Sequence, residues 1–486
     1  MRRNPAALLF VIAFPALLAF PALLASPAFG DVKLHGLFTD HMVTQRDQKT
    51  PVWGTADPGE KVSVSLGDRG AETKADADGK WSVALDAQPA GGPLTLTVQG
   101  KNKIERKDVL VGEVWLCSGQ SNMAWKVARA ANAEQEIADA KHPRIRSFNV
   151  PRKNSSQPES DVAGQWTVCA PDTVAGFSAT AYFFGRELHK ELGVPVGLIN
   201  SSVGGTPIEA WTSLPAQQAM FKKPAVVERS KISKITAPAK GAAVLYNGMI
   251  APLVPYAIRG AIWYQGERNS RFSAASEPWL YRHQLPTMIA NWRADWNQGD
   301  FPFLWAQLPN FRTPQQEPVE SDGWVMVREG MFQSLSVKNT GMAVTVDIGE
   351  ERNIHPANKQ DVGKRLAVWT LAKTYGKQNV ASGPLYRSMT KVDGRIVLKF
   401  DNVGGGLTGG QGGSLQGFAV AGEDRKFVWA EAKIVGETVE VSSPKVKSPV
   451  AARYAWATNP KISLTNKEGL PASPFRTDAW RFESEK

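Results

Sequence analysis

Hydrophobic and polar residues follow two different periods along the chain. From residue 34 to about 108, short segments alternate residue by residue, as in Lys61–Leu66 and Leu94–Val98. Asp78-Gly79 stands before the alternating segment Trp81–Leu85 as a hairpin turn would. The same texture returns from residue 384 to the end. Alternation of this kind, interrupted by turn residues, predicts antiparallel β regions at both ends of the chain.

Between residues 109 and 383 short apolar segments are separated by longer amphipathic ones. The apolar segments predict buried strands at 114–117, 144–150, 194–200, 260–264, 302–308 and 342–346. The amphipathic segments predict helices at 128–140, 179–192, 281–296, 323–337 and 358–375. Strands and helices that alternate in this way favour βαβ units, and therefore a parallel sheet covered by helices on both faces.

The predicted architecture is an α/β protein in four parts. A leader at 1–30 precedes an N-terminal β domain at 31–108, a parallel-sheet domain at 109–383 and a C-terminal β-rich domain at 384–486. In the leader, Arg2 and Arg3 stand before an apolar run, and small residues follow it, which is the pattern of a secretory signal peptide. Pro15 and Pro21 interrupt the run. We therefore expect export to the periplasm or the medium, without a membrane anchor.

The formal net charge of +11 excludes few functions, because the basic residues are spread among acidic ones. Removal of Arg2 and Arg3 with the leader would leave +9. There is no basic run and no nucleic-acid-binding motif, so we expect no nucleic-acid partner. Cys117 and Cys169 could pair in an oxidising compartment or remain buried thiols, and their spacing does not indicate a metal site.

Polar loops follow three of the predicted strands, at residues 118–123, 201–206 and 265–269. The carboxyl ends of parallel strands meet at one edge of a sheet, which is where ligands bind in such folds. In the first loop Gly119 permits a sharp bend that would leave Ser121 at this edge, where a serine can act as a nucleophile. The alternative interpretation is that Ser121 caps the helix that follows.

The sequence also offers the other groups that a serine hydrolase needs, namely a base and donors for the developing oxyanion. His355 lies just beyond the last apolar strand and is the candidate base. Gly204 or Gly205 could supply a backbone N–H, and Gln265 could supply a side-chain amide at the end of its own strand.

Four ordered motifs resemble one family. They are Gly119-Gln-Ser-Asn-Met123, Val203-Gly-Gly-Thr-Pro-Ile-Glu-Ala-Trp211, Trp263-Tyr-Gln-Gly-Glu267 and Ile354-His-Pro356. Together they resemble the bacterial sialate O-acetylesterase-like carbohydrate esterases of the SGNH hydrolase superfamily. The resemblance implies a flavodoxin-like, three-layer catalytic domain with antiparallel β regions on either side. It also implies that Ser121 is the nucleophile and His355 the base, and that Gly204 or Gly205 and Gln265 complete the oxyanion hole.

One feature departs from the broad SGNH pattern, which places an aspartate three residues before the histidine. Residue 352 is arginine here. A carboxylate would still help to orient the imidazole, and Asp347 is the first candidate, ahead of Glu267, Glu350 and Glu351. Asp347 could equally be a structural residue, and a Ser-His dyad is a further possibility.

The aromatic residues in or next to these motifs are candidates for stacking on a sugar, and Trp125, Trp211 and Tyr264 are the first to consider. The predicted function is hydrolysis of O-acetyl esters on carbohydrates, with no metal and no organic cofactor. The acetylated glycan could be sialic acid or a plant cell-wall polysaccharide such as xylan or xyloglucan. The alternative function is a non-catalytic carbohydrate-binding protein, and the oligomeric state stays open.

Overall fold

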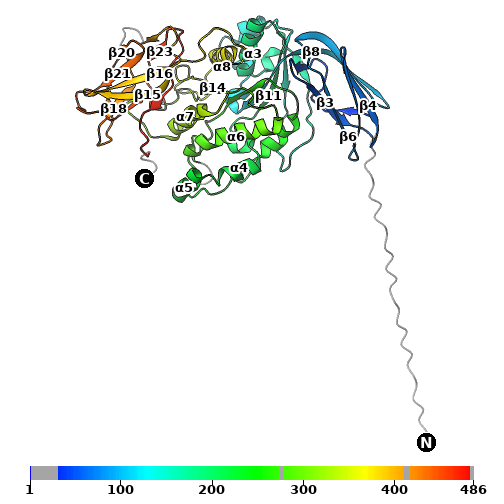
Figure 1. Ribbon diagram of the computed structural model, residues 1–486, viewed down its shortest axis with the longest axis horizontal. Coiled ribbons are helices and arrows are strands. Elements are labelled where there is room, and N and C mark those ends of the chain that lie inside the picture. Colours follow the sequence, from blue (N-terminus) through cyan, green and yellow to red (C-terminus); the bar gives the residue numbers. More distant parts are fainter. Residues whose placement is uncertain (2–30, 274–276, 410–414, 482–486) are drawn as a thin grey trace.

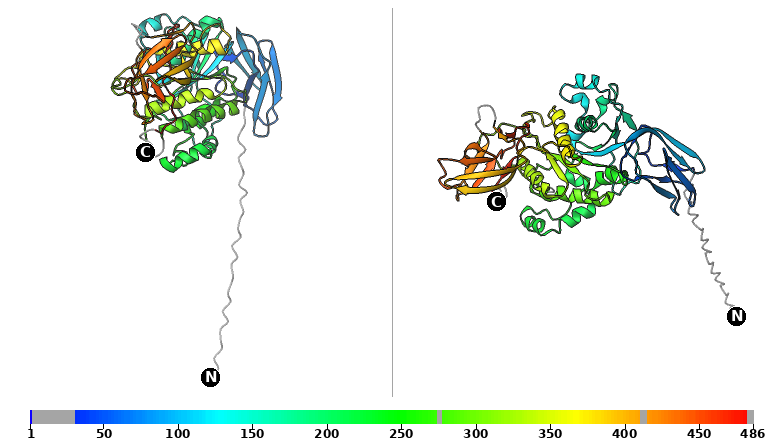
Figure 2. Two further views of the ribbon diagram at one scale, coloured as in Figure 1. Left: turned by 60° about the vertical axis from the view of Figure 1, so that its left-hand side comes forward. Right: turned by 45° about the horizontal axis from the view of Figure 1, so that its top comes forward.

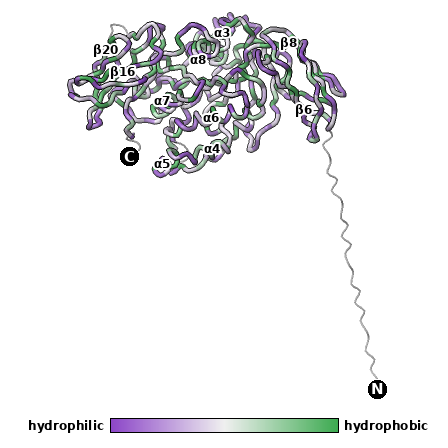
Figure 3. Tube along the Cα trace, in the orientation of Figure 1, coloured by the Kyte–Doolittle hydropathy of each residue, from purple (hydrophilic) through white to green (hydrophobic). Residues whose placement is uncertain are grey.

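The structure is a computed structural model that describes residue 1 and residues 31–273, 277–409 and 415–481. The predicted leader therefore lies outside the described residues, apart from Met1. Three folded parts follow one another in the order of the sequence, with β structure at each end and the α/β part between them (Figure 1). Hydrophobic and hydrophilic residues are interspersed through all three parts (Figure 3).

The N-terminal part is built from antiparallel strands, as the alternation predicts. One three-stranded sheet contains β1 (Lys33–Leu34), β3 (Thr50–Thr55) and β6 (Lys80–Leu85). A second group contains β4 (Lys61–Leu66), β5 (Arg69–Lys74) and β7 (Gly91–Gln99). Along β4 and β6 every second residue is buried, so the polar partners of the alternation face outward.

Strand β8 (Lys103–Gly119) joins this part to the centre of the molecule. Its first half pairs with β7, and the short strand β2 (Val43–Gln45) pairs with it in parallel. Its second half pairs with two strands of the central sheet. The predicted boundary between residues 108 and 109 therefore lies within one continuous strand, and both sheets share its backbone.

The central sheet is mixed, with one antiparallel strand at its edge. Its order is β10 (Trp166–Val168), β9 (Ile145–Asn149), β11 (Val196–Ser202), β8, β12 (Gly260–Tyr264), β13 (Phe303–Ala306) and β14 (Thr340–Ala343). Strand β10 is antiparallel to β9, and the other neighbours are parallel. Numbered along the chain, the parallel strands have the order 2-3-1-4-5-6. Strand β9 is added at the edge beyond β11, and the other five parallel strands, numbered along the chain, have the expected flavodoxin-like order 2-1-3-4-5.

Helices cover both faces of this sheet. Along β8, Val114 and Leu116 belong to one apolar cluster, which contains residues of α6 (Tyr281–Trp296). Trp115 and Cys117 belong to another, which contains residues of α3 (Ala179–Leu192) and α8 (Lys359–Lys373). Alternate side chains of a strand point to opposite faces, so β8 is buried on both sides, as its unbroken apolar run predicts.

Most of the predicted helices are confirmed. Helix α3 has the predicted bounds, and the hydroxyl of Ser178 accepts a hydrogen bond from the N–H of Ala181 at its start. The helix predicted at 128–140 is wrong in extent, because Asn132 adopts a left-handed backbone conformation and only α2 (Ala133–Ala138) follows. Helices α4 (Leu214–Met220) and α5 (Pro224–Ser233) were not predicted.

The C-terminal part consists of small antiparallel sheets. Their strands are β15 (Leu385–Val392), β16 (Arg395–Asp401), β17 (Leu407–Thr408), β18 (Phe418–Ala421), β19 (Val428–Trp429), β20 (Glu431–Val435), β21 (Thr438–Ser442), β22 (Ala451–Tyr454), β23 (Thr465–Asn466) and β24 (Phe475–Arg476). Buried Arg328 on α7 (Gly323–Gln333) donates to the carbonyls of Ala457 (2.7 Å) and Thr458 (3.1 Å). These bonds attach the C-terminal part to the central one, and the two lie side by side in Figure 1 and in the right-hand view of Figure 2.

Cys117 and Cys169 are free, buried thiols in the structure, so they do not form the disulfide that an oxidising compartment would allow. In the described part of the chain, none of the helices is both long enough and apolar enough to cross a bilayer.

Glu113 provides a test of the joint between the first two parts. This fully buried carboxylate on β8 accepts hydrogen bonds from Arg46 Nε at 2.5 Å and from Arg259 Nε at 2.8 Å. We expect Glu113→Gln to lower the free energy of unfolding by about 3 kcal/mol, because it leaves two partly buried guanidinium groups without their counter-charge. Chemical denaturation measures this change.

Glu105→Gln is the matched control, because Glu105 is an exposed residue of the same strand whose ion pair with Lys103 lies at the surface. We expect this substitution to leave the free energy of unfolding nearly unchanged, because exposed ion pairs contribute little to stability. Equal effects of the two substitutions would show that the Glu113 cluster does not stabilise the joint.

Candidate active site

Three strand ends form the candidate site. Gly119, the last residue of β8, lies beside Ser202 of β11 and Tyr264 of β12 in the sheet register. Because β11 and β12 flank β8, the chain crosses from one side of β8 to the other between them. A crevice forms at such a switch point in parallel sheets. The loops at 118–123, 201–206 and 265–269 therefore start at one edge, as predicted.

Gly119 produces the bend that exposes Ser121. Its φ of 142° lies in the region that favours glycine, and a Cβ there would lie 2.2 Å from the carbonyl oxygen of Tyr264. The same carbonyl accepts the N–H of Gln120 at 3.0 Å. Helix α1 (Ser121–Ala124) then begins, with Asn122 buried and Ser121 partly exposed. The bend therefore leaves Ser121 partly exposed at this edge of the sheet.

Ser121 and His355 are in direct contact. The Nε2 atom of His355 lies 2.8 Å from the Oγ atom of Ser121, although 234 residues separate them in the chain. His355 lies in the loop between β14 and α8 and is half-buried. Burial lowers its pKa, and the positive charges of Lys359 and Arg129 lower the pKa further. The imidazole is therefore neutral at neutral pH and can accept a proton from the hydroxyl.

The loop that contains His355 is held by its own polar side chains. The Oδ1 atom of Asn353 accepts the N–H of His355 at 3.0 Å, and its Nδ2 atom donates to the His355 carbonyl at 2.8 Å. Glu350 accepts from Asn353 Nδ2 at 3.0 Å and from the N–H of Ala357 at 2.6 Å. Asn353 therefore fixes the backbone of the histidine.

Asn122 connects this loop to the turn at Ser121. Its Nδ2 atom donates to the carbonyl of Ile354 at 3.0 Å and to Glu267 at 2.5 Å. The sequence reasoning did not single out Asn122 as a site residue, although its position directly after Ser121 was a usable signal. The carboxylate of Glu267 is almost fully buried, and this burial raises its pKa.

Asp347 is placed away from the imidazole. Both oxygens of its carboxylate accept hydrogen bonds at 2.6 Å from the guanidinium of Arg365 on α8. No acidic residue among those that the structure describes forms a hydrogen bond or ion pair with His355. The geometry therefore does not support Asp347 as the carboxylate that orients the histidine, because Arg365 holds it elsewhere.

The candidate oxyanion donors differ in their placement. A Cβ on Gly204 would lie 3.4 Å from the Cβ of Ser121, so this glycine is next to the serine, and Gly204 and Gly205 are both exposed at the sheet edge. Gln265 is fully buried, and its Nε2 atom donates to Asn269 Oδ1 (2.7 Å), Gln120 Oε1 (3.2 Å) and the carbonyl of Thr206 (3.2 Å). The prediction that Gln265 donates to the substrate is therefore not supported, because protein acceptors occupy its amide.

Of the three candidate aromatic residues, only Trp125 is accessible. Its ring stacks on His355, with centroids 5.0 Å apart and planes 18° apart, and it is partly exposed. Trp211 and Tyr264 are fully buried, so neither can present a ring to a sugar, and this correction follows from their packing in the two apolar clusters.

Comparisons with known proteins assign the chain to a family. Residues 111–372, more than half of the chain, match the model of the carbohydrate esterases described as sialic acid-specific acetylesterases. The sialate O-acetylesterases of Pongo abelii and Homo sapiens are each 31% identical to this chain, over 89% of it and 90% of their own lengths.

A carbohydrate acetylesterase from Xanthomonas citri is 40% identical and has a TM-score of 0.84, over 92% of this chain and 100% of that structure. The chain belongs to the family of carbohydrate esterases described as sialic acid-specific acetylesterases. It is a carbohydrate O-acetylesterase, as its four motifs predict.

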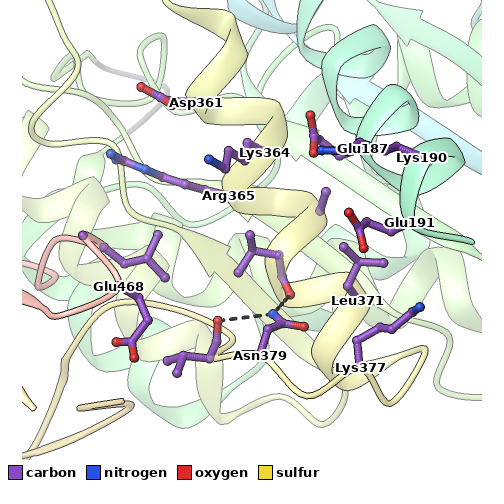
Figure 4. Close-up of a pocket in the computed structure, with 15 residues that line it drawn as sticks. Glu187, Lys190, Glu191, Asp361, Lys364, Arg365, Leu371, Lys377, Asn379 and Glu468 are labelled. Atoms are coloured by element: carbon purple, nitrogen blue, oxygen red, sulfur yellow. Dashed lines mark hydrogen bonds between the residues drawn. The ribbon is translucent and has the colours of Figure 1, made fainter. Parts of the chain in front are cut away.

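A cavity of about 440 Å³ in the esterase lies between α3, α8 and the loop near Glu468, apart from the Ser121–His355 pair (Figure 4). Acidic and basic side chains line it together, among them Glu187, Lys190, Glu191, Lys364 and Glu468. Asn379 on its wall donates to the carbonyls of Val368 and Val380, at 2.9 Å and 3.4 Å. Its charges of both signs indicate no particular ligand.

The pairing of Asp347 with Arg365 gives a test in the esterase. We expect Asp347→Asn to change kcat by less than about threefold, and to cost about 1 kcal/mol of unfolding free energy for the lost pair. A carboxylate that orients a catalytic histidine would cost roughly 10⁴-fold in kcat when it is replaced by its amide. Steady-state acetate release therefore separates the two roles, with Asp361→Asn on α8 as the control.

Proposed function

We propose that the esterase hydrolyses O-acetyl esters on sugars through an acetyl-serine intermediate. The observation that supports this mechanism is the 2.8 Å contact between Ser121 Oγ and His355 Nε2 at the open end of the sheet. A nucleophile and a base within hydrogen-bond reach of each other form the central unit of serine hydrolases.

In the first half of the reaction, His355 accepts the hydroxyl proton while Ser121 Oγ attacks the acetyl carbonyl carbon. The tetrahedral intermediate then collapses, and His355 returns the proton to the sugar oxygen as the ester bond breaks. In the second half, His355 takes a proton from water, and the resulting hydroxide attacks the acetyl-serine. Acetate leaves, and Ser121 regains its proton. Positioned proton transfer of this kind contributes about 10²- to 10⁴-fold to the rate.

The oxyanion is proposed to bind the backbone N–H groups of Ser121 and of Gly204 or Gly205. Among the hydrogen bonds of the described residues, neither glycine N–H has a protein acceptor. Gln120 replaces Gln265 as the candidate side-chain donor, because its Oε1 atom accepts from Gln265 and from the N–H of Arg268, both at 3.2 Å. These contacts use the oxygen of the Gln120 amide and leave its nitrogen for the crevice.

We propose a Ser-His dyad rather than a triad. The ring stacking of Trp125 fixes one face of the imidazole, and the hydrogen bonds of Asn353 fix its backbone. These contacts take over the orienting role of a third residue. Membership of the SGNH superfamily is part of this proposal, with the serine and glycine motifs as its support.

The sugar is proposed to be an O-acetylated sialic acid. Arg129 and Arg268 are exposed next to the site, Arg129 with its guanidinium 5.6 Å from the centre of the Trp125 ring. Two cations at the rim suit a sugar that has a carboxylate. The neutral polysaccharides xylan and xyloglucan would use the ring of Trp125 but gain nothing from these charges.

We also propose that the esterase is exported, because the first thirty residues have the signal pattern described above. The N-terminal mass of the chain recovered outside the cytoplasm tests this proposal. The division into an N-terminal β domain, a catalytic domain and a C-terminal β domain stays a proposal as well, in which both β parts support the central sheet.

The mechanism predicts that Ser121→Ala releases no acetate from an aryl acetate, from acetylated sialic acid or from acetylated xylan and xyloglucan. The expected loss of kcat is at least about 10⁴-fold, because no nucleophile remains. Ser82→Ala, at an exposed position of β6 in the N-terminal part, is the matched control and should keep its activity. Acetate is measured directly for each substrate.

Two results would contradict the account. Acetate release that survives Ser121→Ala would exclude the acetyl-serine mechanism. An unaltered protein that binds these glycans without releasing acetate would instead favour a carbohydrate-binding protein. A preference for neutral acetylated polysaccharide would overturn the proposed sugar while leaving the mechanism intact.

A further inference from the structure

A buried lysine lies behind the Ser121–His355 pair, and the proposed mechanism does not use it. Lys359 is the first residue of α8 and follows His355 by four positions. Its side chain is 0% exposed, which is rare for lysine because an ammonium group loses its hydration when it is buried. The free-energy cost of burying an ammonium group must be offset by favourable contacts. Lys359 makes these contacts with the parts of the site that hold His355.

Two of these contacts involve neighbours of His355. The ammonium nitrogen donates a hydrogen bond to the carbonyl of Pro356, the residue that follows the histidine. It also lies 5.8 Å from the centre of the Trp125 ring, the same ring that stacks on the imidazole. Lys359 therefore contacts both the backbone and the aromatic surface that position His355.

The charges around Lys359 come from several elements. Burial lowers the pKa of Lys359 to about 7. The negative charges of Glu267, after β12, and of Glu350, after β14, act in the opposite direction and raise this pKa. The Lys359 nitrogen lies 5.7 Å from the centre of the buried Tyr264 ring. One carboxylate oxygen of Glu267 accepts a hydrogen bond from Asn122. The other oxygen has no hydrogen-bond partner among the described atoms. The positive charge of Lys359 acts against burial on this carboxylate, because it lowers the pKa of Glu267 whereas burial raises it.

The charges that face His355 are positive on balance. Lys359 on α8 and Arg129 in the turn Val127–Arg129 both lower the pKa of the imidazole, after burial itself. Glu350, in the loop of His355, is engaged by Asn353 and by the N–H of Ala357. A positive charge on the imidazole ring, next to these two cations, is therefore disfavoured. The ring stays in its neutral form, which can accept a proton.

We propose that Lys359 is a positioning residue of this esterase: its ammonium group holds the Pro356 carbonyl and the Trp125 ring, and its charge keeps the imidazole of His355 unprotonated. The proposal rests on the proposed function only in taking His355 as the base. Lys359 itself touches no reacting atom.

The direction of the pH effect follows from the charges. His355 must be neutral to accept a proton, so activity falls on the acid side as the imidazole becomes protonated. Removing the charge of Lys359 removes one of the causes that lower the pKa of His355. The pKa of the imidazole then rises, and the acid limb of kcat/KM moves to higher pH. Arg129 remains, so part of the lowering persists.

Three variants separate the hydrogen bond from the charge. Lys359→Met removes both, Lys359→Gln keeps a donor without charge, and Lys359→Arg keeps a donor and the charge. With an aryl acetate as substrate, we expect Lys359→Met to lower kcat by roughly ten- to hundredfold, since small displacements of a catalytic group have effects of this size. KM should change by less than about threefold. Lys359→Gln should lose less kcat but show the same movement of the acid limb, and Lys359→Arg should keep the limb in place.

A second measurement does not depend on catalysis. The titration of the His355 ring is followed by NMR in the Ser121→Ala protein, with and without Lys359→Met. We expect the midpoint to move to higher pH when the lysine is absent. Lys364→Met, an exposed lysine of the same helix, is the matched control and should leave the titration, kcat and KM unchanged.

The outcomes are distinguishable from a failure of the proposed function. If Lys359→Met and Lys359→Gln fold and leave both the acid limb and the His355 titration unchanged, the proposal is overturned. If Ser121→Ala still releases acetate, the proposed mechanism fails, yet the NMR titration still reports whether Lys359 acts on His355. Unchanged thermal unfolding of Lys359→Met alongside reduced kcat would show that the residue acts on the site rather than on the fold.

Discussion

The pairing of β8 between β11 and β12 is the constraint on which the site depends. It fixes Gly119 beside Ser202 and Tyr264 and so determines where the chain can bend toward solvent. Because β8 is also part of the N-terminal β structure, the same backbone is held by hydrogen bonds in two sheets. A strand anchored in two sheets leaves the turn after it, which leads to Ser121, little freedom to move. Such rigidity is what an aligned nucleophile requires.

The charged and polar groups next to the serine are mostly buried, and this affects the chemistry. Asn122 is 0% exposed, Glu267 4% and Lys359 0%, so their electrostatic interactions are stronger than they would be in water. The same burial makes each unpaired group costly, and the hydrogen bonds of these groups join the loops at 118–123 and 265–269 to the loop that contains His355. The arrangement links the stability of the loops to the protonation state of the histidine, so activity and fold depend on the same contacts.

Local patterns were sufficient to predict many elements and the two central residues. The bounds of α3 and α6 followed from their amphipathic periodicity, and Ser178 marked the start of α3 as a capping residue does. Ser121 lies in the turn after β8 and His355 in the loop after β14, and parallel strands bring the segments that follow them to one edge of the sheet. The family, and with it the acetylesterase activity, followed from four motifs in a fixed order.

Other features depend on contacts that the sequence pattern does not contain. The position of β11 between β9 and β8 is a choice between non-local pairings. Gln265 and Tyr264 lie at a strand end beside the site, but their side chains point into the protein, and the sequence does not specify that direction. Asp347 was a reasonable carboxylate by position alone until Arg365, eighteen residues later, proved to be its partner.

The central claim is that Ser121 becomes acetylated during turnover. The most direct measurement is mass spectrometry of the esterase after it has been mixed with an excess of aryl acetate and quenched in acid within one turnover. The account predicts a mass increase of one acetyl group on the peptide that contains Ser121, absent in Ser121→Ala and lost again as hydrolysis proceeds. Rapid acetate release with no acetyl group on that peptide, or with the group on another residue, would contradict it.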